Sequence, residues 1–169
     1  MTDTERAFVT SLRAAEMHWF FVQGSQAIRQ ELWLPAVVAL LTGVENSIRV
    51  TLRQLAGQRV LDDAELGTTL SNSLLRKASE AGLPVHKLAF PGEVDFGSKI
   101  GANQYDAEIV RVRHNLCHGN ALEWVNRELG DDNAFFTPEC VRPLTQLLLA
   151  LSVEWTESLG SFRASKGLR

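Results

Sequence analysis

The sequence has little of what secreted or membrane-spanning proteins need. Its 169 residues include two cysteines, Cys117 and Cys140, which form no CxxC pair, so no disulfide framework is indicated. The first five residues are polar and acidic, unlike a secretory signal. The longest apolar run, around residues 34–41, is much shorter than the ~20 residues that cross a membrane. We therefore expect a protein of the reducing cytoplasm, with no membrane partner.

An excess of positive charge is also missing. The formal net charge is −3, so the chain as a whole does not attract nucleic acid, and an RNA site would have to be locally basic. Apolar residues make up 45% of the chain, which is ordinary for a globular protein with a core. We expect a single helical domain over residues 1–163, followed by a frayed tail over residues 164–169.

Apolar residues recur along the chain at three- and four-residue steps, the spacing of one face of an α-helix. This spacing predicts helices over residues 4–30, 35–55, 69–81 and 105–117, and from residue 137 onward. Short links between long helices favour antiparallel neighbours, so the sequence predicts an all-α fold, a bundle of four to five helices.

Two segments do not fit this helical pattern. Residues 83–102 have no clear period and contain several prolines and glycines, so we expect a long central loop, either a binding loop or a packed crossover. Residues 121–136 contain a turn signal at residues 130–133 with apolar residues on both sides. This arrangement predicts a short hairpin before the last helix.

Side chains suited to catalysis or phosphate binding are most concentrated in residues 111–120, which contain two arginines, two histidines and two asparagines. The stretch ends a predicted helix just before Gly119, where unsatisfied carbonyls and the helix dipole favour a protonated histidine. Histidine suits proton transfer near neutral pH, and arginine can clamp a phosphate. These groups can cleave RNA without a metal or cofactor, by attack of the ribose 2′-oxygen on the neighbouring phosphorus.

The order of these residues resembles a known motif. Arg113, four further residues and His118 are similar to the motif of the HEPN superfamily, an arginine followed after four to six residues by a histidine. His114 fills the place directly after the arginine, which is often polar in that family, and Gly119 is also usual. Residues 43–49 resemble the glycine–hydrophobic–glutamate stretch of many HEPN helices, which here includes Glu45.

The resemblance implies a helical bundle and a function. Many HEPN proteins are metal-independent ribonucleases of toxin–antitoxin, abortive-infection or CRISPR-linked defence systems, and their motifs usually meet across a homodimer. Carried over, it implies that Arg113 and His118 are catalytic, leaving 2′,3′-cyclic phosphate and 5′-hydroxyl ends on the RNA. His114 and Asn115 would shape the site or contact RNA. The implied partners are RNA, a second copy of the chain and an antitoxin protein.

Three further residues belong to the candidate site. Arg111 is an alternative arginine that we rank below Arg113, and we count it with Asn120 among the substrate-binding candidates. Glu45 borders the apolar stripe of its predicted helix, and a buried carboxylate needs a partner. It either holds Arg113 or a histidine in place or lies partly exposed at the edge.

The spacing of the motif bears on how it would work. Residues five apart on a regular helix point roughly 140° away from each other. The side chains of Arg113 and His118 therefore converge poorly unless the helix ends at His118 or a second chain contributes to the site.

Other interpretations of this stretch remain open. His114, Cys117 and His118 are spaced like half of a zinc site, although Cys140 and His86 are isolated and do not complete it. The histidines can instead cap the end of the helix. At the level of function, the alternatives are a non-catalytic helical module that binds RNA, a nucleotide or a protein partner, and a purely structural dimerisation domain.

Overall fold

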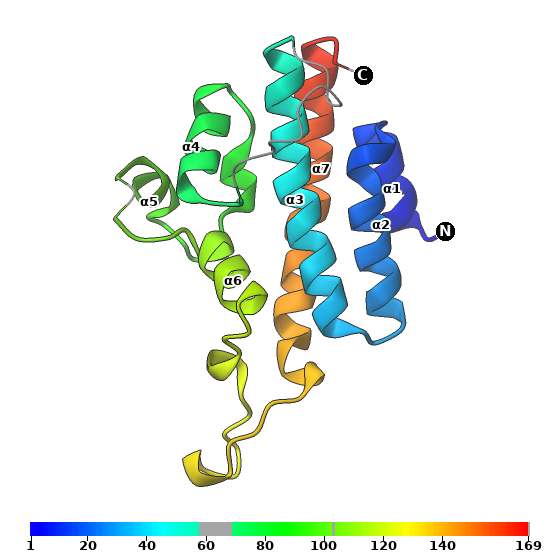
Figure 1. The fold of residues 1–169 in the computed structure, drawn as a ribbon. Helices are drawn as coiled ribbons and strands as arrows, with labels where there is room; N and C mark the ends of the chain where they lie inside the picture. Colours follow the sequence, from blue (N-terminus) through cyan, green and yellow to red (C-terminus); the bar gives the residue numbers. More distant parts are fainter. Residues whose placement is uncertain (58–68, 103, 169) are drawn as a thin grey trace.

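The computed structural model describes residues 1–57, 69–102 and 104–168, which form helices and no β-strand (Figure 1). The α-helices in this part of the chain are α1 (Asp3–Leu12), α2 (Ala15–Arg29), α3 (Trp33–Leu55), α4 (Asn72–Glu80), α5 (Phe96–Ala102), α6 (Glu108–Cys117) and α7 (Arg142–Ser165). Short 3-10 turns are η1 (Val85–Leu88), η2 (Leu122–Trp124), η3 (Asp131–Asn133) and η4 (Pro138–Val141). The all-α prediction is confirmed, but these seven α-helices exceed the four to five expected.

The single helix predicted over residues 4–30 is wrong. Thr2 and Glu5 form a capping box at the start of α1, which ends at Arg13, a residue in the left-handed conformation with φ of 52°. A left-handed residue cannot continue an α-helix, so the chain turns and starts α2 at Ala15. This turn allows α1 to contact both α2 and α7.

The core lies between α2, α3 and α7, which run side by side along the length of the bundle (Figure 1). Phe21, Ile48 and Trp155 are fully buried there, and the Trp155 indole N–H donates to the hydroxyl of Ser47 at 2.9 Å. A Cβ atom at Gly43 would lie 2.9 Å from the ring of Phe21, so this glycine allows α2 and α3 to approach closely. The hydrogen bond therefore joins α7 to α3, and the glycine joins α3 closely to α2.

The long loop predicted over residues 83–102 is only partly correct, because the segment contains η1 and α5 and is packed against the bundle. Glu93 accepts hydrogen bonds from the backbone N–H groups of Phe90 and Glu108, and its carboxylate pairs with Lys99 at 3.1 Å. Asn72 accepts from the Ala107 N–H at 3.0 Å. The two side chains fix the crossover and the start of α6.

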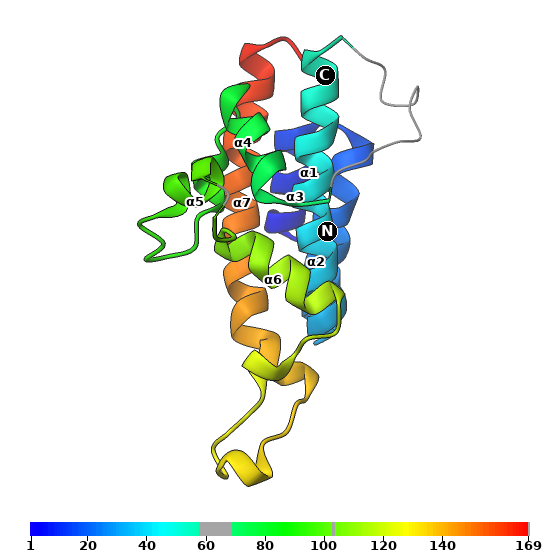
Figure 2. The same ribbon diagram turned by 60° about the vertical axis from the view of Figure 1, so that its left-hand side comes forward.

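The predicted hairpin is reduced to one antiparallel bridge between Asn126 and Phe135. The segment that contains it projects beyond the end of the bundle (Figures 1 and 2). We expected the last helix to begin at residue 137. Instead η4 comes first and α7 begins at Arg142, with Pro143 as its second residue. At its other end α7 continues to Ser165, two residues into the expected tail.

No helix among residues 1–57, 69–102 and 104–168 combines the length and apolar character needed to cross a membrane.

Candidate functional site

The candidate site lies on α6, which packs across α3 (Figure 2). Ile109, Val110 and Val112 of α6 are buried against the bundle. This apolar face leaves the polar residues of the motif on the remaining surface of the helix. His114 and His118 are exposed, whereas Arg113 is partly buried on the side toward α3.

The motif ends the helix, one of the two conditions under which Arg113 and His118 could act on one phosphate. His118 is the C-cap residue of α6, and Gly119 follows in the left-handed conformation with φ of 74°. The Gly119 N–H donates to the Leu116 carbonyl at 3.2 Å, and the Asn120 N–H donates to the Asn115 carbonyl at 2.8 Å. This pair of hydrogen bonds is a Schellman motif, in which glycine supplies the left-handed residue that stops the helix.

The two histidines of the motif lie one helical turn apart. The ring centroids of His114 and His118 are 4.5 Å from each other, and their planes are inclined by 50°. Both rings reach solvent at the end of the helix where the dipole favours positive charge. Either imidazole can therefore exchange a proton with a bound substrate.

Arg113 belongs to an ion-pair cluster with Glu45 and Arg49 of α3, which we call the Glu45 cluster. Glu45 Oε1 accepts from Arg49 Nη1 at 2.8 Å, and Glu45 Oε2 lies 3.5 Å from Arg113 Nη2 and accepts from the Leu70 N–H at 2.8 Å. The side chains of Glu45, Arg49 and Arg113 are 13%, 17% and 22% exposed. Among the described residues, one carboxylate faces two guanidinium groups, so this part of the cluster has a net positive charge within an acidic protein.

The Glu45 cluster resolves one open question and adds one residue. Glu45 does contact Arg113, which was one of the two possibilities that the sequence left open. Arg49 was not among the candidate site residues. Its spacing from Glu45 is the i,i+4 spacing of a helical ion pair, but the contact of Glu45 with Arg113 depends on how α3 and α6 cross.

Arg111 has a different environment from Arg113. It pairs with Glu108 at 2.8 Å and also with Glu123 of η2. Hydrogen bonds from Glu123 and then Glu108 raise the pKa of Arg111 further above its already high ordinary value. Two carboxylates therefore neutralise Arg111, which leaves little positive charge for a phosphate.

Glu123 also holds the two asparagines of the motif. Asn115 Nδ2 donates to Glu123 at 3.0 Å, and Asn120 Nδ2 donates to Asn115 Oδ1 at 3.5 Å. The predicted substrate-binding residues Arg111, Asn115 and Asn120 thus lie together in one network that ties η2 to α6. Of these three residues, only Asn120 is exposed.

Cys140, His86 and His18 lie apart from this site, and Cys117 is the one cysteine within the motif. Cys117 is exposed on α6, whereas the Cys140 thiol interacts with Thr137 at the start of η4. No group of three or more histidine, cysteine, aspartate or glutamate side chains suited to a metal ion occurs in the described part of the chain. His86 lies on η1, and His18 is buried on α2.

Comparisons with protein-family models, with curated proteins and with solved structures gave no match to this chain. The HEPN resemblance therefore rests on the motif and on the glycine–hydrophobic–glutamate stretch of α3.

Proposed function

We propose that this protein is a metal-independent endoribonuclease of the HEPN kind. The observation that carries the proposal is that α6 brings Arg113, a member of the Glu45 cluster, and the exposed His114–His118 pair together on one short helix. A phosphodiester needs cationic donors for its oxygens and proton donors and acceptors for its ester oxygens. Both kinds of group are available here without a metal ion.

The binding role falls to Arg113 and Arg49. Each guanidinium has five N–H donors, and among the described residues Glu45 engages a single nitrogen of each, so this pairing leaves the other donors for phosphate oxygens. Glu45 acts as a positioning residue because it fixes the orientation of both arginines. Arg113 is nearer to the histidines in sequence, and we assign it to the scissile phosphate, with Arg49 on the same or a neighbouring phosphate.

The catalytic role falls to His118, with Arg113. A neutral imidazole removes the proton of the ribose 2′-hydroxyl, and the oxygen forms a new bond to phosphorus. Arg113 stabilises the charge that builds on the phosphorane. The bond from phosphorus to the 5′-oxygen then breaks, and an imidazolium protonates that oxygen. The products are a 2′,3′-cyclic phosphate and a 5′-hydroxyl.

A homodimer supplies the two histidines that this scheme needs. Arg113 extends toward α3, whereas His118 caps the end of α6, so the two side chains of one protomer diverge. In a two-fold dimer the ends of α6 from both protomers face one cleft, and His118 of each copy takes one of the two proton-transfer roles. A protein antitoxin would inhibit the enzyme by covering this cleft.

The test is cleavage of structured and unstructured RNA in EDTA by the wild-type protein, His118→Ala and the matched control His86→Ala. His86 is an exposed histidine on η1, outside the site. Cleavage by the wild type and His86→Ala alone, with 2′,3′-cyclic phosphate ends, is the expected result. Equal cleavage by His118→Ala would show that the activity belongs to another site or to a contaminant.

The runner-up is a non-catalytic module that binds RNA, and a specific observation favours it. The Glu45 cluster can bind phosphates without any help from the histidines, because its charge does not depend on them. RNA binding that is weakened by Arg113→Gln, without cleavage of any RNA by the wild type, would establish this second function in place of the first.

A further inference from the structure

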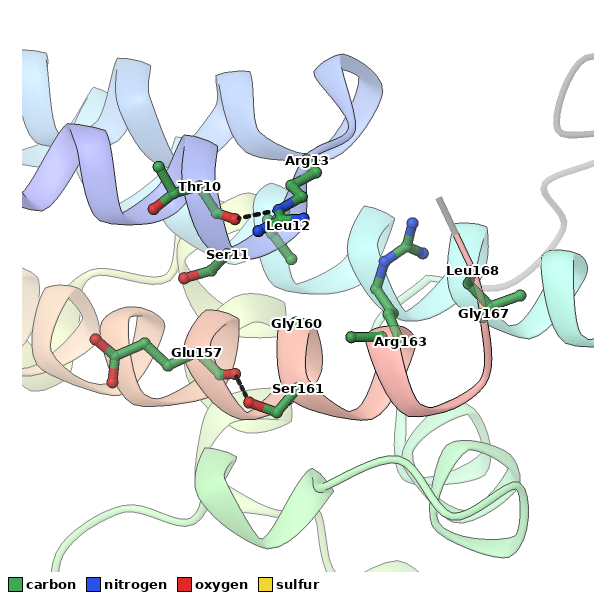
Figure 3. Close-up of a pocket in the computed structure, with 11 residues that line it drawn as sticks. Thr10, Ser11, Leu12, Arg13, Glu157, Gly160, Ser161, Arg163, Gly167 and Leu168 are labelled. Atoms are coloured by element: carbon green, nitrogen blue, oxygen red, sulfur yellow. Dashed lines mark hydrogen bonds between the residues drawn. The ribbon is translucent and has the colours of Figure 1, made fainter.

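A cavity of about 840 Å³ lies between the C-terminal parts of α1 and α7 (Figure 3). Its walls include Ser11 and Arg13 at the end of α1 and Gly160 and Arg163 in the last turns of α7. No residue of α6 lines it, so the cavity is separate from the candidate ribonuclease site. Its volume is within the range of about 300–1,000 Å³ that is usual for small-molecule sites.

The wall of this cavity contains a buried cation, Arg163, that has no ion-pair partner in the part of the chain that the structure describes. The side chain of Arg163 is 2% exposed, and its Nη1 donates to Thr51 Oγ1 at 3.2 Å and to Gln54 Oε1 at 2.5 Å. Its Nη2 has no hydrogen-bond partner, and no ion pair to Arg163 occurs among the described residues. Burial lowers the pKa of Arg163, an effect that Glu16 partly offsets. Arginines are almost never fully buried unless a charged partner compensates them.

A second guanidinium lines the same cavity from the opposite helix. Arg13 ends α1 in the left-handed conformation, and its Nε donates to the Thr10 carbonyl at 3.1 Å. Within the described chain, no carboxylate pairs with Arg13 either. Glu157 is the one acidic residue among the described lining residues, and Figure 3 shows its side chain directed away from both arginines.

The shape of the cavity is set by the contact of two helices. A Cβ atom at Gly160 would clash with the backbone carbonyl oxygen of Ser11, so α1 and α7 touch through their backbones at this point. Backbone atoms of packed helices do not adjust easily. Arg13 follows the contact residue Ser11 on the α1 side, and Arg163 follows Gly160 on α7. The cavity is therefore a fixed feature of the fold.

We infer that the cavity binds the oxyanion group of a small molecule, a carboxylate or a phosphate, between Arg163 and Arg13. The anion supplies the acceptor that Arg163 Nη2 lacks among the described residues and acts as a counter-ion to both guanidinium groups. Guanidinium groups match the geometry of both kinds of oxyanion through paired N–H donors, and hydrogen bonds between ionised groups are stronger than those between neutral groups. The rest of the molecule occupies the cavity toward Glu157.

The inference is tested by titrating the full-length protein with inorganic phosphate and, separately, with acetate, each against chloride at equal ionic strength. Calorimetry gives the dissociation constant, and thermal unfolding gives the stabilisation that binding produces. The variants are Arg13→Gln and a matched control, Arg6→Gln, which removes another exposed arginine of α1 outside the cavity. Arg113→Gln shows whether any phosphate signal comes from the Glu45 cluster.

The expected result is saturable binding of at least one of the two anions by the wild type, Arg6→Gln and Arg113→Gln. In Arg13→Gln the binding should be about tenfold weaker, because one charge-assisted contact is lost. Arg163→Gln should abolish the binding. If Arg163→Gln does not fold, the affinity of Arg13→Gln decides the question. A response equal to that of chloride, or equal affinity in Arg13→Gln and Arg6→Gln, would overturn the inference. A response to one anion alone identifies the class of ligand.

Discussion

Glu45→Gln is the substitution that tests the Glu45 cluster most directly. The amide keeps the size of the side chain and one acceptor oxygen but loses the charge. The Leu70 N–H at 2.8 Å can still donate to the amide oxygen, whereas the ion pairs with Arg49 at 2.8 Å and Arg113 at 3.5 Å are lost. Two guanidinium groups would then repel each other in a partly buried site where the described residues offer no other counter-ion.

The magnitude follows from these contacts. A charge-assisted hydrogen bond such as that of Arg49 contributes about 1.5–3 kcal/mol, and the longer Arg113 contact contributes about 0.5 kcal/mol. Because the cluster is partly solvated, we expect the free energy of unfolding to fall by about 2 kcal/mol. For a domain of this size that loss lowers the melting temperature by roughly 4–8 °C.

Denaturant unfolding of Glu45→Gln, Arg49→Gln and the double variant measures this loss and the coupling between the two residues. We expect a coupling free energy of about 1 kcal/mol or more. Glu80→Gln, which neutralises an exposed carboxylate on α4, is the control and should change stability by less than about 0.5 kcal/mol. Equal losses in Glu45→Gln and Glu80→Gln, with no coupling, would refute the view that Glu45 holds the two arginines.

Three further predictions follow from single contacts. Arg49→Gln should weaken RNA binding and lower the slope of log K against log salt by about 0.7, the value for one phosphate of a single strand, while Arg6→Gln should not change it. Gly160→Ala should lower the free energy of unfolding by about 2 kcal/mol or more, measured by denaturant unfolding, because its methyl group would meet the Ser11 carbonyl. Burial lowers the pKa of His18, so its neutral form is favoured in the folded state and the unfolded state binds more protons. Stability should therefore fall as the pH drops below about 6.5, and unfolding curves of His18→Gln should show a weaker dependence on pH.

The sequence predicted those features of the fold that depend on local spacing. Apolar periodicity identified the helices that became α3, α4 and α6, and Gly119 was expected to end α6. The break at Arg13 was missed because an arginine in the left-handed conformation has no local signal. α5 was missed because it has few residues and two glycines, and its stability comes from burial of Phe96 and Ile100 against the bundle.

The candidate site, like the fold, was predicted where it depends on local sequence spacing and missed where it depends on contacts between helices. The order of residues in the motif was enough to place Arg113 and His118 near the end of one helix. The contact of Glu45 with Arg113 was left open because it depends on the crossing of α3 and α6. Arg49 was not counted as a site residue, because its i,i+4 pair with Glu45 links it to the site only through that crossing. Arg163 was missed for a different reason, since we expected the chain to fray close to that residue and did not expect a buried charge there.

The charges around α6 explain how an acidic protein can have a basic site. Arg111 and Arg113 are two residues apart, so they point to different sides of the helix. Arg111 meets Glu108 and Glu123 and is neutralised, whereas Arg113 shares the single carboxylate of Glu45 with another arginine. The direction of each side chain, not the number of arginines in the motif, therefore decides where positive charge remains. In the ribonuclease that we propose, this difference favours Arg113 over Arg111 as the arginine that contacts phosphate, and RNA should then bind on the side of α6 that faces α3.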